Sequence, residues 1–249
     1  MKWYITLIIL LFVSISVGQN DALFNKGISF YKEKKYTEAI DAWKQIEQHG
    51  SHSASLYFNL GNAYYKLNSI GPSVYYYEKA LQLAPNDSDI KNNLAFAENA
   101  RIDAIEPLPQ SVFSKWYNSI ATLFTFDGWA KTAIALVIMF VILFLGYYFS
   151  SSERTKRFLF VSSLLSVFLG LVSLTMAYQT YTDFINDKPA IIFAESAEVK
   201  SAPSVGGPSV FILYEGTKVQ IIDQDNEWYR IKLADGKDGW LPNNDLKEL

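Results

Sequence analysis

The chain contains no cysteine and only two histidines among its 249 residues. The lack of cysteine excludes disulfides, thiol nucleophiles and thiolate metal ligands. The histidines, His49 and His52, have the spacing of a metal-binding pair, but no cluster of carboxylates accompanies them in the sequence. Because a metal site requires further ligands in an ordered frame, we predict that the chain binds no metal.

Catalytic sequence motifs are missing as well. The sequence has no Gly-x-Ser-x-Gly nucleophile motif, no glycine-rich phosphate-binding loop and no His-Glu-x-x-His zinc motif. We therefore predict no catalytic residues, no cofactor and no enzymatic activity.

An excess of basic residues is also lacking, since the formal net charge is -3. Nucleic acid binding depends on neutralising many phosphates, so nucleic acid is excluded as a partner. The charges gather in Asp21–Arg101 and Asp183–Leu249, whereas two long stretches between these regions carry almost none. This distribution predicts soluble domains on both sides of membrane-spanning segments.

The first 18 residues have the pattern of a secretory signal peptide. One lysine precedes an apolar run from Ile5 to Val13, and the small residues Ser14, Ser16 and Gly18 follow. We predict a signal peptide over residues 1–18, with Gln19 as the first mature residue. The alternative is an uncleaved membrane anchor, and either form places the following segment outside the cytoplasm.

Two later segments are long enough to cross a membrane. Thr132–Phe149 and Phe158–Thr182 contain no charged residue, and we assign the spans to residues 131–149 and 158–182. The loop between them, residues 150–157, carries Arg154, Lys156 and Arg157. Positive charges mark cytoplasmic loops, so both outer flanks are predicted to face away from the cytoplasm.

The segment before the first span, residues 105–130, contains a proline-rich linker and an amphipathic stretch. Val112–Phe124 mixes Trp116, Tyr117, Ile120 and Leu123 with polar residues at helical spacing. Such a segment either lies flat on a membrane or forms a short core helix, and the sequence leaves both alternatives open.

Residues 19–104 contain an internal repeat. Alignment of its two units places Gly27 over Gly61, which gives a period of 34 residues. The small and large residues of the two units, among them Ala39, Trp43 and Tyr77, resemble those of tetratricopeptide repeats. In that family small residues let antiparallel helices approach and aromatic residues fill the gaps. The match departs from the family pattern at Gly71-Pro72-Ser73, where a charge and an alanine are usual.

The resemblance implies that one face of the stacked helices forms a groove for extended peptides. By position in the repeat, this groove would be lined by Phe24, Ile28, Tyr31, Phe58, Asn62 and Tyr65. The carboxylate clamp of some family members needs lysine and asparagine where Phe24 and Ile28 stand, so an apolar or helical partner segment is expected instead. The alternative is that these residues only pack one repeat against the next.

Residues 189–249 change to alternating apolar and polar positions, which predicts short strands and a small closed barrel. The predicted strands are Ala190–Phe193, Ala197–Lys200, Val210–Tyr214, Lys218–Ile222, Trp228–Leu233 and Gly239–Leu241. Gly216, Trp228, Gly239 and Trp240 resemble recurring residues of bacterial SH3-like domains. That resemblance implies binding to protein or cell wall, with Trp228, Tyr229 and Trp240 as contact residues. The alternative role, core packing, is favoured for Trp228.

The order of these parts, with the words IKNNLAFA and RIDAIEPLP after the repeats, resembles the BatE-like proteins of the Bacteroides aerotolerance operon. The predicted fold is multidomain: an all-α tetratricopeptide helical repeat, a two-helix transmembrane hairpin and a small all-β SH3-like barrel. The resemblance implies a bacterial inner-membrane location, with both folded domains on the periplasmic side.

The resemblance also implies partners in envelope stress or oxygen tolerance, namely membrane proteins with von Willebrand factor A domains and a MoxR-type ATPase. We therefore expect a scaffold that binds membrane or periplasmic proteins through the repeats. The alternative is a cell-wall sensor, in which the SH3-like domain binds peptidoglycan.

Overall fold

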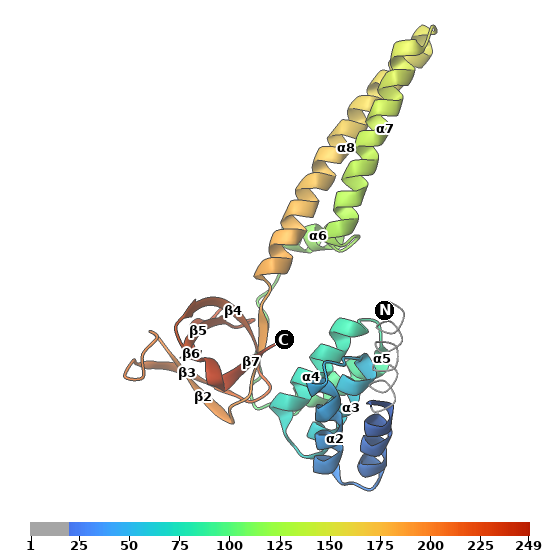
Figure 1. Ribbon diagram of the computed structural model, residues 1–249. Coiled ribbons are helices and arrows are strands. Elements are labelled where there is room, and N and C mark those ends of the chain that lie inside the picture. The colour runs from blue at the N-terminus through green and yellow to red at the C-terminus, as the bar shows by residue number, and fades with distance from the viewer. Residues whose placement is uncertain (1–19) are drawn as a thin grey trace, which may run out of the picture. The chain divides into compact units, whose positions relative to one another are not determined.

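The computed structural model describes residues 20–249 (Figure 1). The predicted signal peptide, residues 1–18, lies outside the described residues. The chain forms two compact units. One unit combines the residues up to Pro107 with Lys188–Leu249, and the other comprises Leu108–Asp187.

Within residues 20–104 the repeat region consists of five helices, as the 34-residue period predicts. They are residues 20–32, α2 (Tyr36–Gln48), α3 (Ala54–Lys66), α4 (Ile70–Leu83) and α5 (Ser88–Asn99). The tight turns inside the two units are equivalent, since Lys34 and Asn68 both have positive φ, at 61° and 57°. These residues lie one period apart, so the local backbone repeats together with the sequence.

Large aromatic residues fill the core between the repeat helices. Trp43, Tyr76 and Tyr77 are almost fully buried. Each of the aligned glycines gives one of these rings its space: a Cβ added at Gly27 would lie 2.2 Å from Trp43 Nε1, and one at Gly61 would lie 2.7 Å from the Tyr77 ring. The predicted pairing of small and aromatic residues is confirmed.

The C-terminal region is one antiparallel sheet of seven strands in the order β3-β2-β6-β5-β4-β1-β7. The strands are β1 (Pro189–Ile192), β2 (Ser196–Lys200), β3 (Ser209–Tyr214), β4 (Lys218–Asp225), β5 (Trp228–Lys232), β6 (Asp238–Pro242) and β7 (Leu246–Glu248). Six strands agree with the predicted ones to within a few residues, whereas β7 was not predicted.

The predicted closure of the barrel differs from the observed sheet. Within residues 189–249 the end strands β3 and β7 do not pair with each other, so the sheet curls without a closing ladder. The unpredicted β7 extends the sheet beyond β1, and Ile192 pairs with Leu246. Alternate residues such as Val199, Ile231 and Leu241 fill the interior.

The sheet docks against α4 of the repeats within the same unit. Ile191 is completely buried in the core of the repeats, and Phe193 packs edge-on against Tyr75 with ring centroids 5.4 Å apart. A salt bridge of 2.7 Å joins Lys218 to Glu78 at the same junction. The repeats and the SH3-like domain therefore share apolar core and do not simply follow each other along the chain.

Gly71 explains where the second repeat departs from the family pattern. Its backbone N–H donates to Glu215 Oε2 over 3.0 Å, and an added Cβ would lie 2.9 Å from the carbonyl oxygen of Ile192. The N–H groups in the first turn of a helix have no partner inside the helix, so a carboxylate there is favourable. Gly71 thus allows the backbone of the sheet to approach the start of α4.

The linker after α5 also binds the sheet. Asp103 Oδ2 accepts hydrogen bonds from Tyr214 N at 2.8 Å and from Thr217 Oγ1 at 2.5 Å. Ile105 packs against the apolar interior of the sheet. Residues predicted as repeat and linker therefore strap the SH3-like domain to the repeats.

The second unit consists of α6 (Val112–Ala121) and an antiparallel pair, α7 (Phe126–Phe149) and α8 (Glu153–Asn186). Both α7 and α8 are long and apolar enough to cross a membrane. Helical structure extends beyond the predicted spans, and only residues 150–152 separate the two helices. The predicted eight-residue loop is shorter because its basic residues form the first turns of α8.

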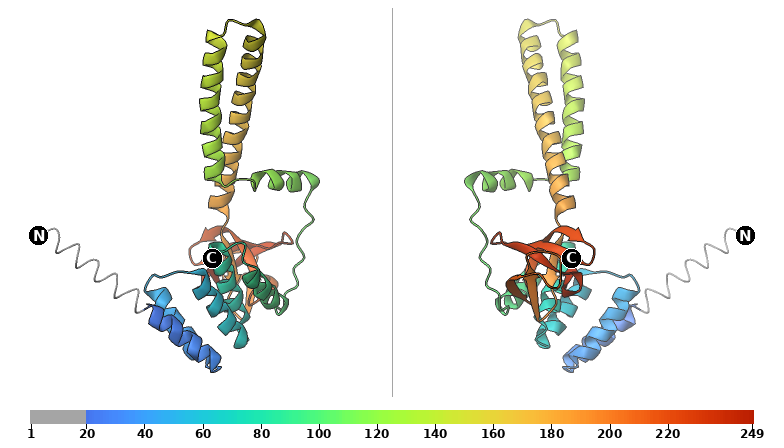
Figure 2. Two further views of the ribbon diagram at one scale, coloured as in Figure 1. Left: turned by 90° about the vertical axis from the view of Figure 1, so that its right-hand side faces the viewer. Right: turned by 90° about the vertical axis from the view of Figure 1, so that its left-hand side faces the viewer.

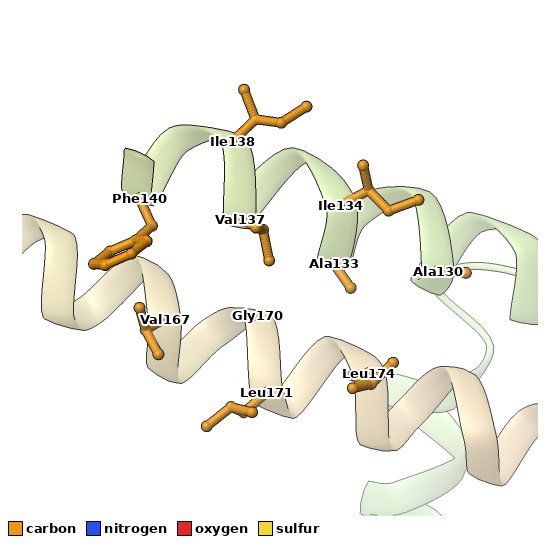
Figure 3. Close-up of a pocket in the computed structure, with 10 residues that line it drawn as sticks. All are labelled: Ala130, Ala133, Ile134, Val137, Ile138, Phe140, Val167, Gly170, Leu171 and Leu174. Carbon is orange, nitrogen blue, oxygen red and sulfur yellow. The ribbon is translucent and has the colours of Figure 1, made fainter. Parts of the chain in front are cut away.

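Small residues form the seam between α7 and α8. The buried residues of α8 are Ser163, Ser166, Gly170, Ser173 and Ala177. Two of them make hydrogen bonds between the helices: Ser166 Oγ donates to Leu136 O and Ser173 Oγ donates to Trp129 O, each over 2.8 Å. Beside the seam lies an apolar furrow of about 460 Å³, in which Val137 and Phe140 face Val167 (Figure 3).

Candidate functional site

A hollow of about 180 Å³ opens on the repeat region where four helices meet. It is lined by Tyr31, Asn62, Tyr65, Lys66, Tyr77, Asn93 and Phe96. These residues come from the first helix, α3, α4 and α5, which are brought together by the stacking of the repeats. The hollow therefore combines aromatic rings with side-chain amides.

The amide of Asn62 is held at the centre of this lining. Its Oδ1 accepts a hydrogen bond from Tyr77 Oη at 2.7 Å and another from Asn93 Nδ2 at 2.8 Å. Burial raises the pKa of Tyr77, so its hydroxyl keeps its proton and remains a donor. These bonds fix the orientation of Asn62 without any ligand.

The structure separates the six residues predicted for the groove into three groups. Tyr31, Asn62 and Tyr65 line the hollow together. Phe24 lines a different hollow, of about 390 Å³, beside His52. Ile28 and Phe58 are partly buried against the repeat core. The hollow thus brings together three of the six predicted residues.

Four residues that line the hollow were not predicted for the groove, namely Lys66, Tyr77, Asn93 and Phe96. Two of them lie one repeat period after asparagines of α3. Phe96 lies 34 positions after Asn62, and Asn93 lies 34 positions after Asn59. Phe96 is 63% exposed, so most of its ring is open to solvent beside the hollow. Helix α5 forms a third, partial repeat unit, and applying the groove positions to it would have identified Phe96 but not Asn93, because Asn59 was not among the predicted positions.

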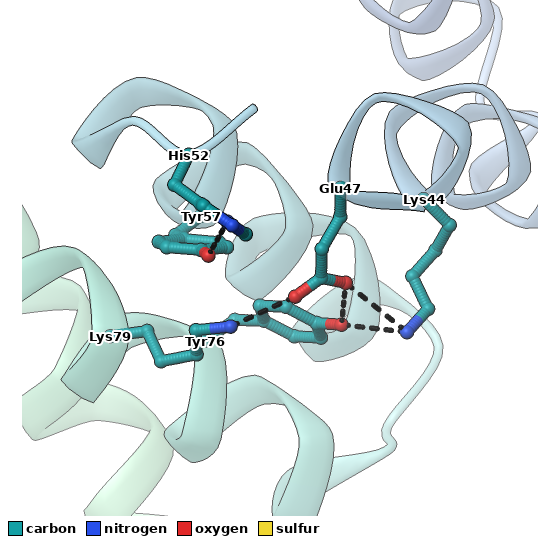
Figure 4. A network of polar contacts seen from close by, with 6 residues as sticks. All are labelled: Lys44, Glu47, His52, Tyr57, Tyr76 and Lys79. Atoms are coloured by element: carbon teal, nitrogen blue, oxygen red, sulfur yellow. Dashed lines mark hydrogen bonds and ion pairs between the residues drawn. The ribbon is translucent and has the colours of Figure 1, made fainter. Parts of the chain in front are cut away.

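A network of charged and aromatic residues joins α2 to α4 (Figure 4). Glu47 forms a salt bridge of 2.9 Å with Lys79 and a longer one of 3.4 Å with Lys44. Tyr76 Oη donates to Glu47 over 2.9 Å and accepts from Lys44 over 2.8 Å. The ammonium group of Lys79 also lies 4.1 Å from the centre of the Tyr57 ring.

Burial and polar contacts have opposite effects on the pKa of Glu47. Burial is the largest single influence and raises the pKa, but the hydrogen bonds from Lys79 and Tyr76, together with the positive charges of Lys79 and Lys44, lower it to about 2. Because these contacts join residues of α2 to residues of α4, the network holds two repeat helices together.

His52, one of the two histidines, belongs to the same region. Its Nδ1 lies 2.5 Å from Tyr57 Oη. Among residues 20–249 no group of three or more histidine, aspartate or glutamate side chains could hold a metal ion. The prediction that the chain binds no metal remains a prediction.

The three candidate residues of the SH3-like domain lie on opposite faces of the sheet. Tyr229 packs against the apolar interior, and its hydroxyl donates to Glu248 over 2.7 Å. Trp228 and Trp240 lie on the other face, because Trp240 pairs with Arg230 and side chains alternate along β5. Both tryptophans are half-buried and neither belongs to the core of the sheet.

Comparison with known families agrees with this division of the chain. Residues 21–49 and 54–87 each match a tetratricopeptide repeat, and residues 195–247 match a bacterial SH3 domain. The repeats and the SH3 domain predicted from the sequence are therefore confirmed as parts of this chain.

No curated protein matches the chain. Among solved structures, a NlpC/P60 family protein from Bacillus cereus is similar over 28% of this chain, with 24% identity and a TM-score of 0.22. The similar region spans 23% of that protein's chain.

Proposed function

We propose that the chain is a membrane-anchored scaffold that binds partner proteins through the hollow of its repeats. The observation that carries this proposal is the hollow itself, in which the exposed ring of Phe96 stands beside the oriented amides of Asn62 and Asn93. Aromatic anchors next to amides suit a peptide segment, because rings bind apolar side chains and amides can bind the backbone.

The hairpin of α7 and α8 would be the anchor of this scaffold. Its large apolar residues point outward while small and hydroxyl residues occupy the seam, which is the residue distribution expected in lipid. Arg154, Lys156 and Arg157 stand at the connection between the helices, which favours a cytoplasmic position for that end. The repeats and the SH3-like domain would then lie in the periplasm, beside the bacterial inner membrane.

The partners proposed here are membrane or periplasmic proteins with an apolar segment. The resemblance of the domain order to BatE-like proteins favours partners with von Willebrand factor A domains, acting in aerotolerance or envelope stress. Their assembly would require no catalysis by this chain.

The test is recovery of partners by the tagged full-length protein from its native membrane in a gentle detergent, measured by mass spectrometry. Phe96→Ala removes an exposed ring from the hollow, whereas Phe58→Ala would also disturb the ring of Tyr77 at 6.0 Å. Leu83→Ala is the matched control, because Leu83 is 53% exposed and lies outside the lining of the hollow.

We expect Phe96→Ala to reduce recovery of specific proteins about tenfold, as for a central anchor residue. Leu83→Ala should leave recovery unchanged. Equal recovery by both variants would contradict binding through the hollow.

A second function, binding of the cell wall, is favoured by the bacterial SH3 match and by the position of Trp228 and Trp240 outside the core. Under this alternative, Trp240→Ala would abolish sedimentation of the protein with purified peptidoglycan, and Phe96→Ala would leave it unchanged. Sedimentation that survives Trp240→Ala and Trp228→Ala would contradict wall binding through this face.

A further inference from the structure

Helix α6 has one apolar face. At about 100° per residue, the apolar side chains of the helix fall within an arc of roughly 140°. These side chains are Val112, Phe113, Trp116, Tyr117 and Ile120. The remaining arc carries the polar residues Ser114, Lys115, Asn118 and Ser119. The helix is thus built for a boundary between an apolar and a polar medium.

The apolar face has little cover from the rest of its unit. Val112 is 86% exposed, Phe113 is 73% exposed and Trp116 is 61% exposed. The rings of Phe113 and Trp116 stand beside each other, with centroids 6.1 Å apart. Of the ten residues in α6 only Ala121 is buried. Contiguous apolar exposure of this kind marks a surface that another apolar medium covers.

The position of α6 on the hairpin is fixed by specific contacts. Tyr117 Oη donates to Asp183 Oδ2 over 3.1 Å, and Trp129 Nε1 donates to Ala121 O over 3.2 Å. Phe124, in the turn after α6, packs edge-on against Trp129. Figure 2 shows that α6 runs across the axis of α7 and α8 at the end of the hairpin. A helix that crosses the axis of a membrane span runs along the membrane plane.

Aromatic residues gather at this same end of the hairpin. Phe126 packs against Tyr181 at 5.6 Å and against Phe184 at 5.3 Å, measured between ring centroids. Tyrosine and tryptophan favour the boundary between hydrocarbon and headgroups. Trp129 and Tyr181 therefore place the connection to α6 at the level of that boundary.

We propose that α6 lies in the lipid headgroup region, with its apolar face in the membrane that the hairpin spans. This inference rests on the proposed function, which makes the hairpin a membrane anchor. Lipid is favoured over a protein partner because large apolar side chains are exposed in α6, in the following turn at Leu123 and Phe124, and along α7, the next helix of the chain. Helix α6 would then fix the depth of the hairpin and mark where the linker leaves the lipid.

The lack of cysteine makes a direct test available, since a single introduced cysteine is the sole site for a thiol-reactive spin label. The full-length protein would be reconstituted in vesicles of phosphatidylcholine and phosphatidylglycerol. Labels would be placed by Phe113→Cys on the apolar face, Asn118→Cys on the polar face and Ile138→Cys on the outer surface of α7. Collision rates with oxygen, which enters lipid, and with a nickel chelate, which stays in water, report the depth of each label.

We expect the label at 113 to favour oxygen over nickel several-fold more than the label at 118 does. The label at 138 should be the deepest of the three. Val112→Cys, on the same face as Phe113, provides a second reading should the label at 113 perturb the helix.

The outcomes separate failure of this inference from failure of the proposed anchor. A deep label at 138 with equal values at 113 and 118 would overturn the position of α6 and leave the anchor standing. Shielding of the label at 113 from both reagents would mean a protein contact and would also overturn the inference. A water-exposed label at 138 would overturn the anchor, and the inference with it.

Discussion

The repeats and the hairpin both pair antiparallel helices, yet they place large and small residues in opposite ways. The repeat helices bury Trp43, Tyr76 and Tyr77 between them. In the hairpin the buried residues are small except for Trp129, as Ser166 and Gly170 illustrate, and most large apolar side chains point outward. Large apolar side chains are therefore mostly buried in the repeats and mostly exposed in the hairpin.

The contrast follows from the medium that each region requires. In water the removal of large apolar side chains is the main favourable contribution to folding, so the repeats bury aromatic rings. Lipid provides no such driving force between helices, and close packing with hydrogen bonds must hold them instead. The serine bonds to Leu136 O and Trp129 O in the hairpin are contacts of that kind.

The largest expected effect comes from removing a ring from the core of the repeats. Trp43→Ala leaves a cavity and should lower the free energy of unfolding of the repeats by about 3–5 kcal/mol. Phe168→Ala removes an outward-facing ring of the hairpin and should change the stability of the hairpin by less than about 0.5 kcal/mol. Hydrogen exchange of each region, measured in detergent, distinguishes the two. Equal effects would contradict the contrast between the regions.

A smaller effect is expected for the ion-pair network of Glu47 in the repeats. The pKa of Glu47 is about 2 in the folded chain and 4.5 as its ordinary value. A lowered pKa means that the stabilisation is complete above about pH 4.5 and is lost as the pH falls toward 2. Glu47→Gln should therefore cost about 2–3 kcal/mol at pH 7.

The difference between wild type and Glu47→Gln should shrink below pH 4.5. Lys79 depends on pH in the opposite sense. Burial lowers its pKa, but the hydrogen bond to Glu47 outweighs burial and the pKa is raised overall from 10.5. The stabilisation that Lys79 contributes is therefore lost only as the pH rises above 10.5. Denaturant unfolding at several pH values checks this window. A difference that stays constant down to pH 2 would show that the pKa of Glu47 is not lowered.

The smallest expected effect on stability comes from adding a methyl group at a helical glycine, Gly61 in the repeats or Gly170 in the hairpin. An added Cβ would meet the Tyr77 ring at 2.7 Å at Gly61 but only Leu136 Cβ at 3.6 Å at Gly170. Gly61→Ala should therefore destabilise the repeats by about 1–2 kcal/mol, because a close-packed core resists extra volume. Gly170→Ala should be tolerated. Thermal unfolding of both variants provides the measurement, and a stable Gly61→Ala variant would contradict tight packing there.

Much of the fold could be predicted because its signals are local. The 34-residue period identified the repeat helices, and alternating positions identified six of the seven strands. Strand β7 was missed because it has only three residues, Leu246–Glu248, and no alternation of its own. Its place is set by pairing with β1.

The docking of the sheet on the repeats could not be predicted from local patterns. Gly71 and Glu215 are 144 positions apart in sequence, and nothing around Glu215 indicates its partner. The signal that existed was a departure from the family pattern at Gly71-Pro72-Ser73. At the candidate site, family positions indicated Tyr31, Asn62 and Tyr65, whereas Phe96 required the period to be extended into the third unit.

The most direct test of the scaffold is photo-cross-linking in the native membrane. A benzophenone side chain would replace Phe96 in one variant and Leu83 in another, because both residues are exposed and only Phe96 lines the hollow. We expect cross-links from position 96 to specific membrane or periplasmic proteins and none of these from position 83. The same products from both positions, or none from position 96, would contradict the proposed scaffold.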